Sequence, residues 1–151
     1  MMEKKYTYHA TAQWHLHEQG FVESEYSVPR TISFSAPLEF GGEPGFWTPE
    51  HFLLAGVSSC FVATFRAVAE ASKMEFQGIE VRIEGQVEKR EGGLQFTRIT
   101  LHPVLIIFRD KDRELAGRLL EKAERHCLVG RSLACTIELQ PKILTEKPVL
   151  V

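Results

Sequence analysis

Two cysteines, Cys60 and Cys127, are the residues whose type and setting point most directly to chemistry. Cys60 lies within an uncharged stretch from 52 to 65, and Cys127 lies where a second, amphipathic helix is expected to end. Cysteine reacts as a thiolate, and oxidation of one thiolate to a sulfenic acid requires a second thiol to trap it as a disulfide. The pair therefore predicts paired thiol chemistry if the fold brings the two sulfurs together.

A Cys60 thiolate needs a stabilising partner, because burial in an apolar helix raises the pKa of a thiol. Cys60 lies too far along its expected helix to be stabilised by the dipole at the first turn, so a cation is the expected partner. Arg66 points away, about 240° around the helix from Cys60. Arg30 and Arg131 remain, and Arg30 is the preferred candidate. The competing interpretation of Cys60 is a small hydrophobic core residue.

Length and charge restrict the classes of function. The chain has 151 residues, 44% of them hydrophobic, which predicts a single domain over residues 1–151. A net charge of −2 and a pI near 6.3 give no basic surface for nucleic acid or for an anionic membrane. No window is expected to reach the roughly 18 apolar residues of a membrane span, and the first residues lack the apolar segment of a signal peptide. The sequence therefore predicts a cytoplasmic protein with neither partner.

The cysteine count favours reduced thiols. Three cysteines form an odd number in a chain without an export signal, which argues against a structural disulfide framework. The absence of Cys-x-x-Cys argues against a thioredoxin-type motif and a cysteine zinc site. His15 and His17 share one strand face but lack a neighbouring carboxylate or thiolate, so they are interpreted as surface residues, and Cys135 is interpreted as a core residue. No metal and no cofactor are expected.

Alternating apolar and polar residues predict most of the strands. The expected strands cover 6–16, 21–28, 31–34, a hairpin from 79 to 108 that turns at Glu91-Gly92-Gly93, and 134–140. Pro103 lies inside the second arm of the hairpin and predicts a bulge or an edge strand there. The sequence therefore indicates antiparallel sheets.

Two helices are expected to carry the two cysteines. Thr48-Pro49-Glu50 has the residues of a helix start, and the helix should run to about Lys73. Its middle is apolar on every side, which predicts a buried central helix. Asp110 or Asp112 begins the second helix, Gly130 is placed to stop it, and four-residue spacing directs Cys127 toward the interior.

Two motifs resemble one known family. The sequence Thr-Pro-Glu-His-Phe-Leu-Leu-Ala-Gly-Val-Ser-Ser-Cys-Phe at 48–61, preceded by Gly-Gly, is similar to the central-helix motif of the OsmC/Ohr family of organic hydroperoxide reductases. His-Cys-Leu-Val-Gly-Arg-Ser-Leu at 126–133, which closes a leucine-rich helix after a Gly-Gly hairpin, resembles the second cysteine motif of that family. The resemblance covers essentially the whole chain.

The resemblance implies an OsmC-like α+β fold, with antiparallel sheets wrapped around a buried central helix in an intertwined homodimer. It also implies reduction of organic hydroperoxides, with Cys60 as the peroxidatic cysteine, Cys127 as the resolving cysteine and Glu50 as a carboxylate of the site. A lipoyl-type or small-molecule dithiol is the implied reductant. Glu50 is equally explained as a first-turn glutamate that stabilises its own helix.

The sequence departs from the family at the arginine that the family places in the loops before the central helix. Residues 8–20 and 35–47 contain no arginine, so the role is vacant, taken by Arg30, or replaced by a histidine such as His15 or His17. An OsmC-like small-molecule binding or thiol-sensing protein without peroxidase turnover is therefore the alternative function. The loop aromatics Phe40, Phe46 and Trp47 either line an apolar substrate channel or cover the core.

Overall fold

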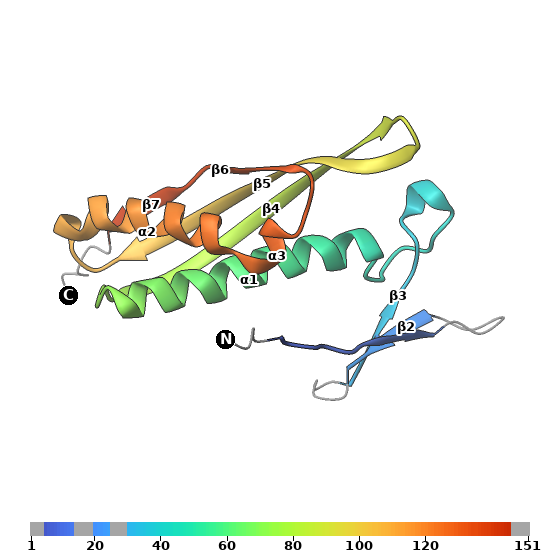
Figure 1. Cartoon of the computed structure of the whole chain (residues 1–151), viewed down its shortest axis with the longest axis horizontal. Helices are drawn as coiled ribbons and strands as arrows, with labels where there is room; N and C mark the ends of the chain where they lie inside the picture. The colour runs from blue at the N-terminus through green and yellow to red at the C-terminus, as the bar shows by residue number, and fades with distance from the viewer. Residues whose placement is uncertain (1–4, 14–19, 25–29, 146–151) are drawn as a thin grey trace. The chain divides into compact units, whose positions relative to one another are not determined.

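The computed structural model describes residues 5–13, 20–24 and 30–145. The chain forms two compact units, unit 1 (Met1–Leu53) and unit 2 (Leu54–Val151). The single-domain interpretation stays a prediction. The helices and strands follow in chain order (Figure 1): β1 (Thr11–Gln13), β2 (Gly20–Glu23), β3 (Thr31–Phe34), η1 (Leu38–Phe40), α1 (Pro49–Ala71), β4 (Phe76–Arg90), β5 (Gly93–Ile107), η2 (Asp110–Asp112), α2 (Arg113–His126), α3 (Leu128–Arg131), β6 (Thr136–Leu139) and β7 (Lys142–Thr145).

Unit 1 contains a small antiparallel sheet in the order β1-β2-β3. The strand expected at 31–34 is confirmed as β3. The strand expected at 6–16 is wrong over 6–10, which is not in a strand; only 11–13 form β1, and 14–16 lie outside the described residues. Of the strand expected at 21–28, residues 21–23 form part of β2, and 25–28 are likewise outside the described residues.

The start of α1 is confirmed where the sequence predicts it. The Thr48 hydroxyl oxygen accepts a hydrogen bond from the backbone N–H of His51 at 3.1 Å, and the Phe52 N–H donates to the Thr48 carbonyl at 2.9 Å. One bond caps the helix and the other is its first i→i−4 bond, so Pro49 occupies the first helical position, where its missing N–H costs nothing.

Within this single chain, α1 buries one stripe rather than its whole circumference. Its buried residues recur every four positions: Val57, Phe61, Phe65 and Ala69. The expectation that no segment is apolar enough to span a membrane is wrong by composition, because α1 contains an 18-residue window with a mean hydropathy of 1.7, of which 22% is buried. The core helix of a water-soluble protein meets the same criterion, so the finding is weak evidence for a membrane span.

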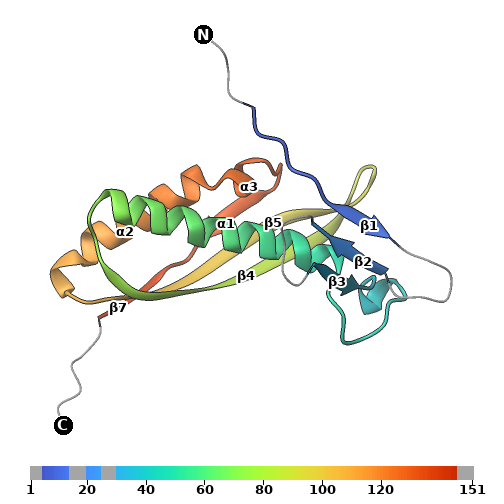
Figure 2. The ribbon, with the colours of Figure 1, turned by 90° about the horizontal axis from the view of Figure 1, so that it is seen from below.

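Unit 2 is a mixed sheet with α2 and the body of α1 side by side on one face (Figures 1 and 2). The predicted hairpin is confirmed, since β4 and β5 pair antiparallel along most of their length. β6 and β7 both pair with β5 in parallel, so the sheet is not purely antiparallel. The core between helices and sheet includes Phe61 and Phe65 of α1, Leu119 and Leu120 of α2, and Ile99, Leu101, Leu105 and Ile107 of β5.

Pro103 lies in the central strand β5 and not at an edge, and the two irregularities of the β4–β5 pairing fall elsewhere. A proline is tolerated in this central strand because, within the described part of the chain, β5 lacks a paired residue at position 103 on the side away from β4. β6 pairs with residues 98–101 and β7 with 104–107, so position 103 has no ladder partner there. The Gln140 N–H donates to the Leu101 carbonyl at 2.9 Å, and residue 103, two positions on, turns its backbone to the same side. The missing N–H of Pro103 therefore breaks no pairing.

The second helix ends before Gly130, contrary to the sequence-based prediction. α2 stops at His126, Cys127 adopts an extended conformation with φ −64° and ψ 111°, and α3 begins at Leu128. Gly130 lies inside α3 and is buried. The α+β class is confirmed, and the intertwined dimer stays a prediction.

Candidate thiol site

The central stretch of α1 presents Cys60 beside the core of unit 2. Cys60 is half-buried and packs against the apolar cluster between helices and sheet. Its sulfur lies 4.0 Å from the hydroxyl oxygen of Thr64, one helical turn further along α1. Residues four apart on a helix are neighbours on one face, so α1 alone accounts for this contact.

The break between α2 and α3 directs Cys127 onto α1. Cys127 is 2% exposed, and its sulfur donates to the backbone carbonyl of Val57 at 3.8 Å. Val57 lies three residues before Cys60, and each cysteine is close enough to the other to shift its pKa. All three cysteines are free thiols. The fold therefore brings together the two thiols that the sequence singles out.

The Cys60 sulfur is surrounded by hydrogen-bond donors. Burial raises the pKa of the Cys60 thiol, but hydrogen bonds from the backbone N–H of Val129, the Cys127 thiol, the Thr64 hydroxyl and the backbone N–H of Leu128 outweigh burial and leave that pKa below its ordinary value. Hydrogen bonds to the charged form favour that form. These donors are two amides, a thiol and a hydroxyl, and the cation that the sequence led us to expect stays a prediction.

Cys127 is shifted in the opposite direction. Burial is the main cause and, with the adjacent Cys60 sulfur, raises the pKa of Cys127 to about 11, against the opposing effect of hydrogen bonds from the backbone N–H groups of Gly130 and Val129. Cys127 is therefore a protonated thiol at neutral pH, while Cys60 is the thiol that ionises more readily. The two environments therefore shift the pKa values of the two thiols in opposite directions.

The other predicted site residues lie in unit 1. Glu50 is in the first turn of α1, ten residues before Cys60, which corresponds to roughly 15 Å along a helix axis. Its Oε2 atom is buried without a hydrogen-bond partner among the described residues. Arg30 is exposed and pairs with Glu23, with 3.2 Å between Nε and Oε2. The roles assigned to Glu50 and Arg30 stay predictions.

The remaining candidates are placed as follows. Arg131 is exposed on α3 and lines a surface hollow of about 570 Å³ together with Cys135. Cys135 precedes β6 and packs against the core, as its structural interpretation requires. His15 and His17 lie outside the described residues. Within 5–13, 20–24 and 30–145, no group of three histidine, cysteine or acidic side chains is placed to hold a metal ion.

The loop aromatics Phe40, Phe46 and Trp47 are exposed. Phe46 and Trp47 line a hollow of about 320 Å³ in unit 1, together with Gly45 and His51. The Trp47 ring stacks on Phe52, with 5.4 Å between ring centroids. Phe40 is 57% exposed. The arrangement leaves apolar ring surface available in the loop before α1.

Sequence reasoning missed Thr64 and the amides of Leu128 and Val129. Thr64 had a signal, since it lies four residues after Cys60 on a predicted helix. The amides had none, because any non-proline residue carries an N–H group, and these two are free only because a new helix begins at Leu128. The break at Cys127 therefore had to be known first.

Comparison with known proteins identifies relatives of this chain. The family model described as "OsmC-like protein" matches residues 41–142. The uncharacterized protein YmaD of Bacillus subtilis (strain 168) is 27% identical over 138 residues, which cover 88% of this chain and 90% of YmaD.

Several solved structures share the fold. An OsmC-like protein of unknown function from Vibrio cholerae has a TM-score of 0.82 at 15% identity, covering 91% of this chain and 99% of the other. An organic hydroperoxide resistance protein, OsmC, from Legionella pneumophila has a TM-score of 0.72 at 24% identity, covering 94% and 99%. The organic hydroperoxide resistance protein OhrB of Bacillus subtilis has a TM-score of 0.66 at 22% identity, covering 91% and 98%.

Proposed function

Because this chain belongs to the OsmC-like protein family, we propose that it is a thiol-dependent peroxidase that reduces organic hydroperoxides through Cys60 and Cys127. The observation that carries the proposal is that the fold holds Cys127 against the turn of α1 that carries Cys60, with its sulfur 3.8 Å from the Val57 carbonyl oxygen. The hydrogen bonds that lower the Cys60 pKa support it, since a peroxidatic cysteine must be a thiolate. The resolving thiol loses its proton to the departing hydroxyl group when the disulfide forms.

The proposed cycle has three balanced steps. The Cys60 thiolate attacks one peroxide oxygen of ROOH, and with one proton this gives ROH and Cys60 sulfenic acid. The Cys127 thiol attacks the sulfenic sulfur, forming the Cys60–Cys127 disulfide, and its proton leaves with the hydroxyl group as water. An external dithiol then reduces the disulfide and is itself oxidised to a disulfide.

The proposed substrates are organic hydroperoxides with an apolar tail rather than hydrogen peroxide. Cys60 packs against the apolar cluster of unit 2, so a substrate that reaches its sulfur contacts hydrocarbon. Apolar pockets gain affinity by removing apolar ligand surface from water, which hydrogen peroxide lacks. Arg30 is proposed as the cation that stabilises the Cys60 thiolate, and Glu50 as a carboxylate that orients the cation.

The active form is proposed to be a homodimer. α1 leaves much of its apolar surface uncovered within one chain, with Val62 and Val68 half-buried and Ala63 and Ala67 exposed. A helix that is apolar on all sides normally lies inside a core, and a second copy supplies the missing cover. Light scattering at micromolar concentration tests this: a mass of one chain contradicts the dimer.

A peroxide-consumption assay tests the activity. Wild-type protein with dithiothreitol should consume cumene hydroperoxide faster than hydrogen peroxide. Cys60→Ser should abolish consumption. In the absence of dithiothreitol, Cys127→Ser should retain the first turnover and then stop as a sulfenic acid that a dimedone probe labels.

Cys135→Ser is the matched control, because it removes the third thiol without touching the pair. It should consume peroxide at the wild-type rate. Equal rates for wild type and Cys60→Ser remove Cys60 from the mechanism. A Cys60–Cys127 disulfide that forms once without turnover favours the alternative, a thiol-sensing or small-molecule binding protein.

A further inference from the structure

The short turn that follows Cys127 contacts both sulfurs. The first intrahelical bond of α3 runs from the Arg131 N–H to the Cys127 carbonyl at 2.9 Å. The N–H groups of residues 128–130 therefore precede the helical ladder and have no helical acceptor. The position of this turn sets where the Cys127 sulfur lies relative to α1.

Gly130 is the tightly packed residue of the turn. A Cβ atom added to Gly130 would lie 3.1 Å from Ile137 Cδ1 and 3.5 Å from Cys127 Sγ. The first distance is shorter than ordinary van der Waals contact, and the second means that the added atom would touch the sulfur. Gly130 is not among the glycines with positive φ, so space rather than backbone conformation is what its missing side chain provides.

We propose that Gly130 is a positioning residue for the thiol pair: its lack of a side chain lets α3 lie between Ile137 and Cys127 and so keeps the Cys127 sulfur within reach of Cys60. The added Cβ would press on Ile137 Cδ1 and lie in ordinary contact with the sulfur. β6 holds the backbone of Ile137 in the sheet, and the proposal is that α3 and Cys127, rather than the Ile137 side chain, supply the few tenths of an ångström that the Cβ needs. This inference rests on the proposed function for its catalytic meaning and on packing alone for its geometry.

Helix propensity alone predicts that Gly130→Ala is favourable for α3, whereas the proposal predicts that it displaces the Cys127 sulfur. This difference makes the inference testable. Replacing glycine by alanine inside a helix normally stabilises the helix. Gly117 in α2 supplies the comparison, since the nearest atom to an added Cβ there is Ile143 Cδ1 at 4.0 Å, an ordinary contact. Gly117→Ala should therefore leave the thiol pair undisturbed. Gly130→Ala should displace the Cys127 sulfur.

The experiment measures how fast the two sulfurs join under a general thiol oxidant, so that it does not depend on peroxide reactivity. Full-length wild type, Gly130→Ala and Gly117→Ala are treated with diamide and quenched with an alkylating agent, and the Cys60–Cys127 disulfide is quantified by peptide mapping. We expect formation to be slower by about threefold to tenfold in Gly130→Ala, because small displacements of reacting atoms cost rate steeply. Gly117→Ala should match wild type.

A second variant separates positioning from a general structural effect. Ile137→Val removes the Cδ1 atom that the added Cβ would meet, so the double variant Gly130→Ala/Ile137→Val should recover most of the wild-type rate. A wild-type rate in Gly130→Ala, or a slow rate that Ile137→Val does not restore, overturns the inference. If all variants behave as expected with diamide and wild type fails to consume hydroperoxide, the positioning role stands and the peroxidase proposal fails.

Discussion

The Cys127 sulfur donates to the carbonyl oxygen of Val57 at 3.8 Å, a contact between residues 70 positions apart. Val57 lies about one helical turn before Cys60, so one stretch of α1 carries Cys60 and also holds Cys127. The Cys127 thiol donates to the Val57 carbonyl, and a hydrogen bond from the same thiol lowers the pKa of Cys60.

The Cys127 thiol should influence the ionisation of Cys60. Cys127→Ala removes one of the hydrogen bonds that hold the Cys60 pKa down, so that pKa should rise and less thiolate should be present at pH 7. Cys127→Ser retains an O–H donor and should shift the pKa less. The rate of Cys60 alkylation by iodoacetamide between pH 5 and 11, followed by peptide mass spectrometry, measures the midpoint.

In the wild type, the same titration should show Cys127 ionising in a separate step at about pH 11, well above Cys60. Midpoints for Cys60 that coincide in wild type, Cys127→Ala and Cys127→Ser contradict a hydrogen bond from Cys127. The Cys135→Ser variant provides the reference for a change at a thiol outside the pair.

The backbone amide of Leu128 should stabilise the Cys60 thiolate. Leu128→Pro removes this N–H at the first position of α3, where proline is tolerated, and Cys127 already has the extended ψ of 111° that suits a residue before proline. We expect a higher Cys60 pKa and a melting temperature close to that of wild type. The same alkylation titration and a thermal melt measure the two quantities.

Leu128→Ala is the control for this substitution, because it retains the N–H and removes a side chain that is 65% exposed. Its Cys60 pKa should equal that of wild type. If alanine and proline raise the pKa equally, the side chain of Leu128 and not its amide is responsible.

Lys73, just after the end of α1, has a strained backbone conformation that a glycine would adopt without strain. Lys73 has φ 56°, in the left-handed region that disfavours side chains, and the Met74 N–H closes the helix by donating to the Ala69 carbonyl at 2.9 Å. Lys73→Gly should therefore raise the free energy of unfolding by about 0.5–1 kcal/mol. Urea denaturation measures it, with Lys73→Ala as the control that leaves the strain in place. Equal stability of the two variants contradicts the prediction.

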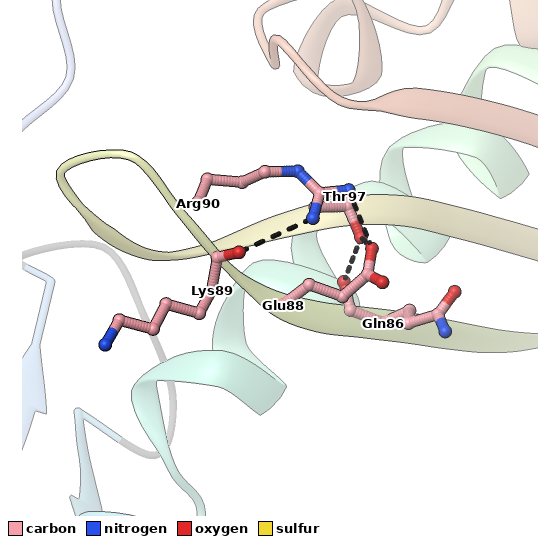
Figure 3. Close-up of polar contacts among 5 residues, drawn as sticks. All are labelled: Gln86, Glu88, Lys89, Arg90 and Thr97. Carbon is pink, nitrogen blue, oxygen red and sulfur yellow. Dashed lines mark hydrogen bonds and ion pairs between the residues drawn. The ribbon is translucent and has the colours of Figure 1, made fainter.

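Glu88 should make the β4–β5 hairpin sensitive to acid. The Thr97 hydroxyl donates to its carboxylate, and Arg90 Nη2 lies 3.0 Å from Oε2 (Figure 3). The hydrogen bond from Thr97 is the first cause, and the Arg90 charge the second, that lower the Glu88 pKa. A lowered folded-state pKa contributes stability above the unfolded-state pKa, and that contribution is lost as the pH falls through the folded-state pKa.

Thermal melts from pH 3 to 7 measure this contribution. Glu88→Gln should lower the melting temperature at pH 7, and its effect should become smaller as the pH falls through the folded-state pKa of Glu88. The effect should be small, since the side chain is exposed. Glu91→Gln, at the turn of the same hairpin, controls for the loss of one negative charge. A Glu88→Gln effect that is the same at pH 3 and pH 7 contradicts the prediction.

The local elements could be predicted from the sequence because their causes are local. Thr48 and Pro49 fix the start of α1 through a cap and a free first position, and the alternation around Gly92 and Gly93 fixes the hairpin. The two motifs around Cys60 and Cys127 identify the family, and with it the fold. Strand β7 was missed, because its four residues are too few to show a reliable period.

The tertiary structure decided what stabilises the reactive sulfur. Sequence reasoning looked for a cation because charged side chains are visible in a sequence, whereas free backbone amides are not. The N–H groups of Leu128 and Val129 act on Cys60 only because the chain breaks at Cys127 and starts a new helix against α1. After the break, Gly130 packs between Ile137 and Cys127, an arrangement of distant segments that no local pattern records. The residue types and their spacing thus identified the two thiols, and long-range packing determined how each one ionises.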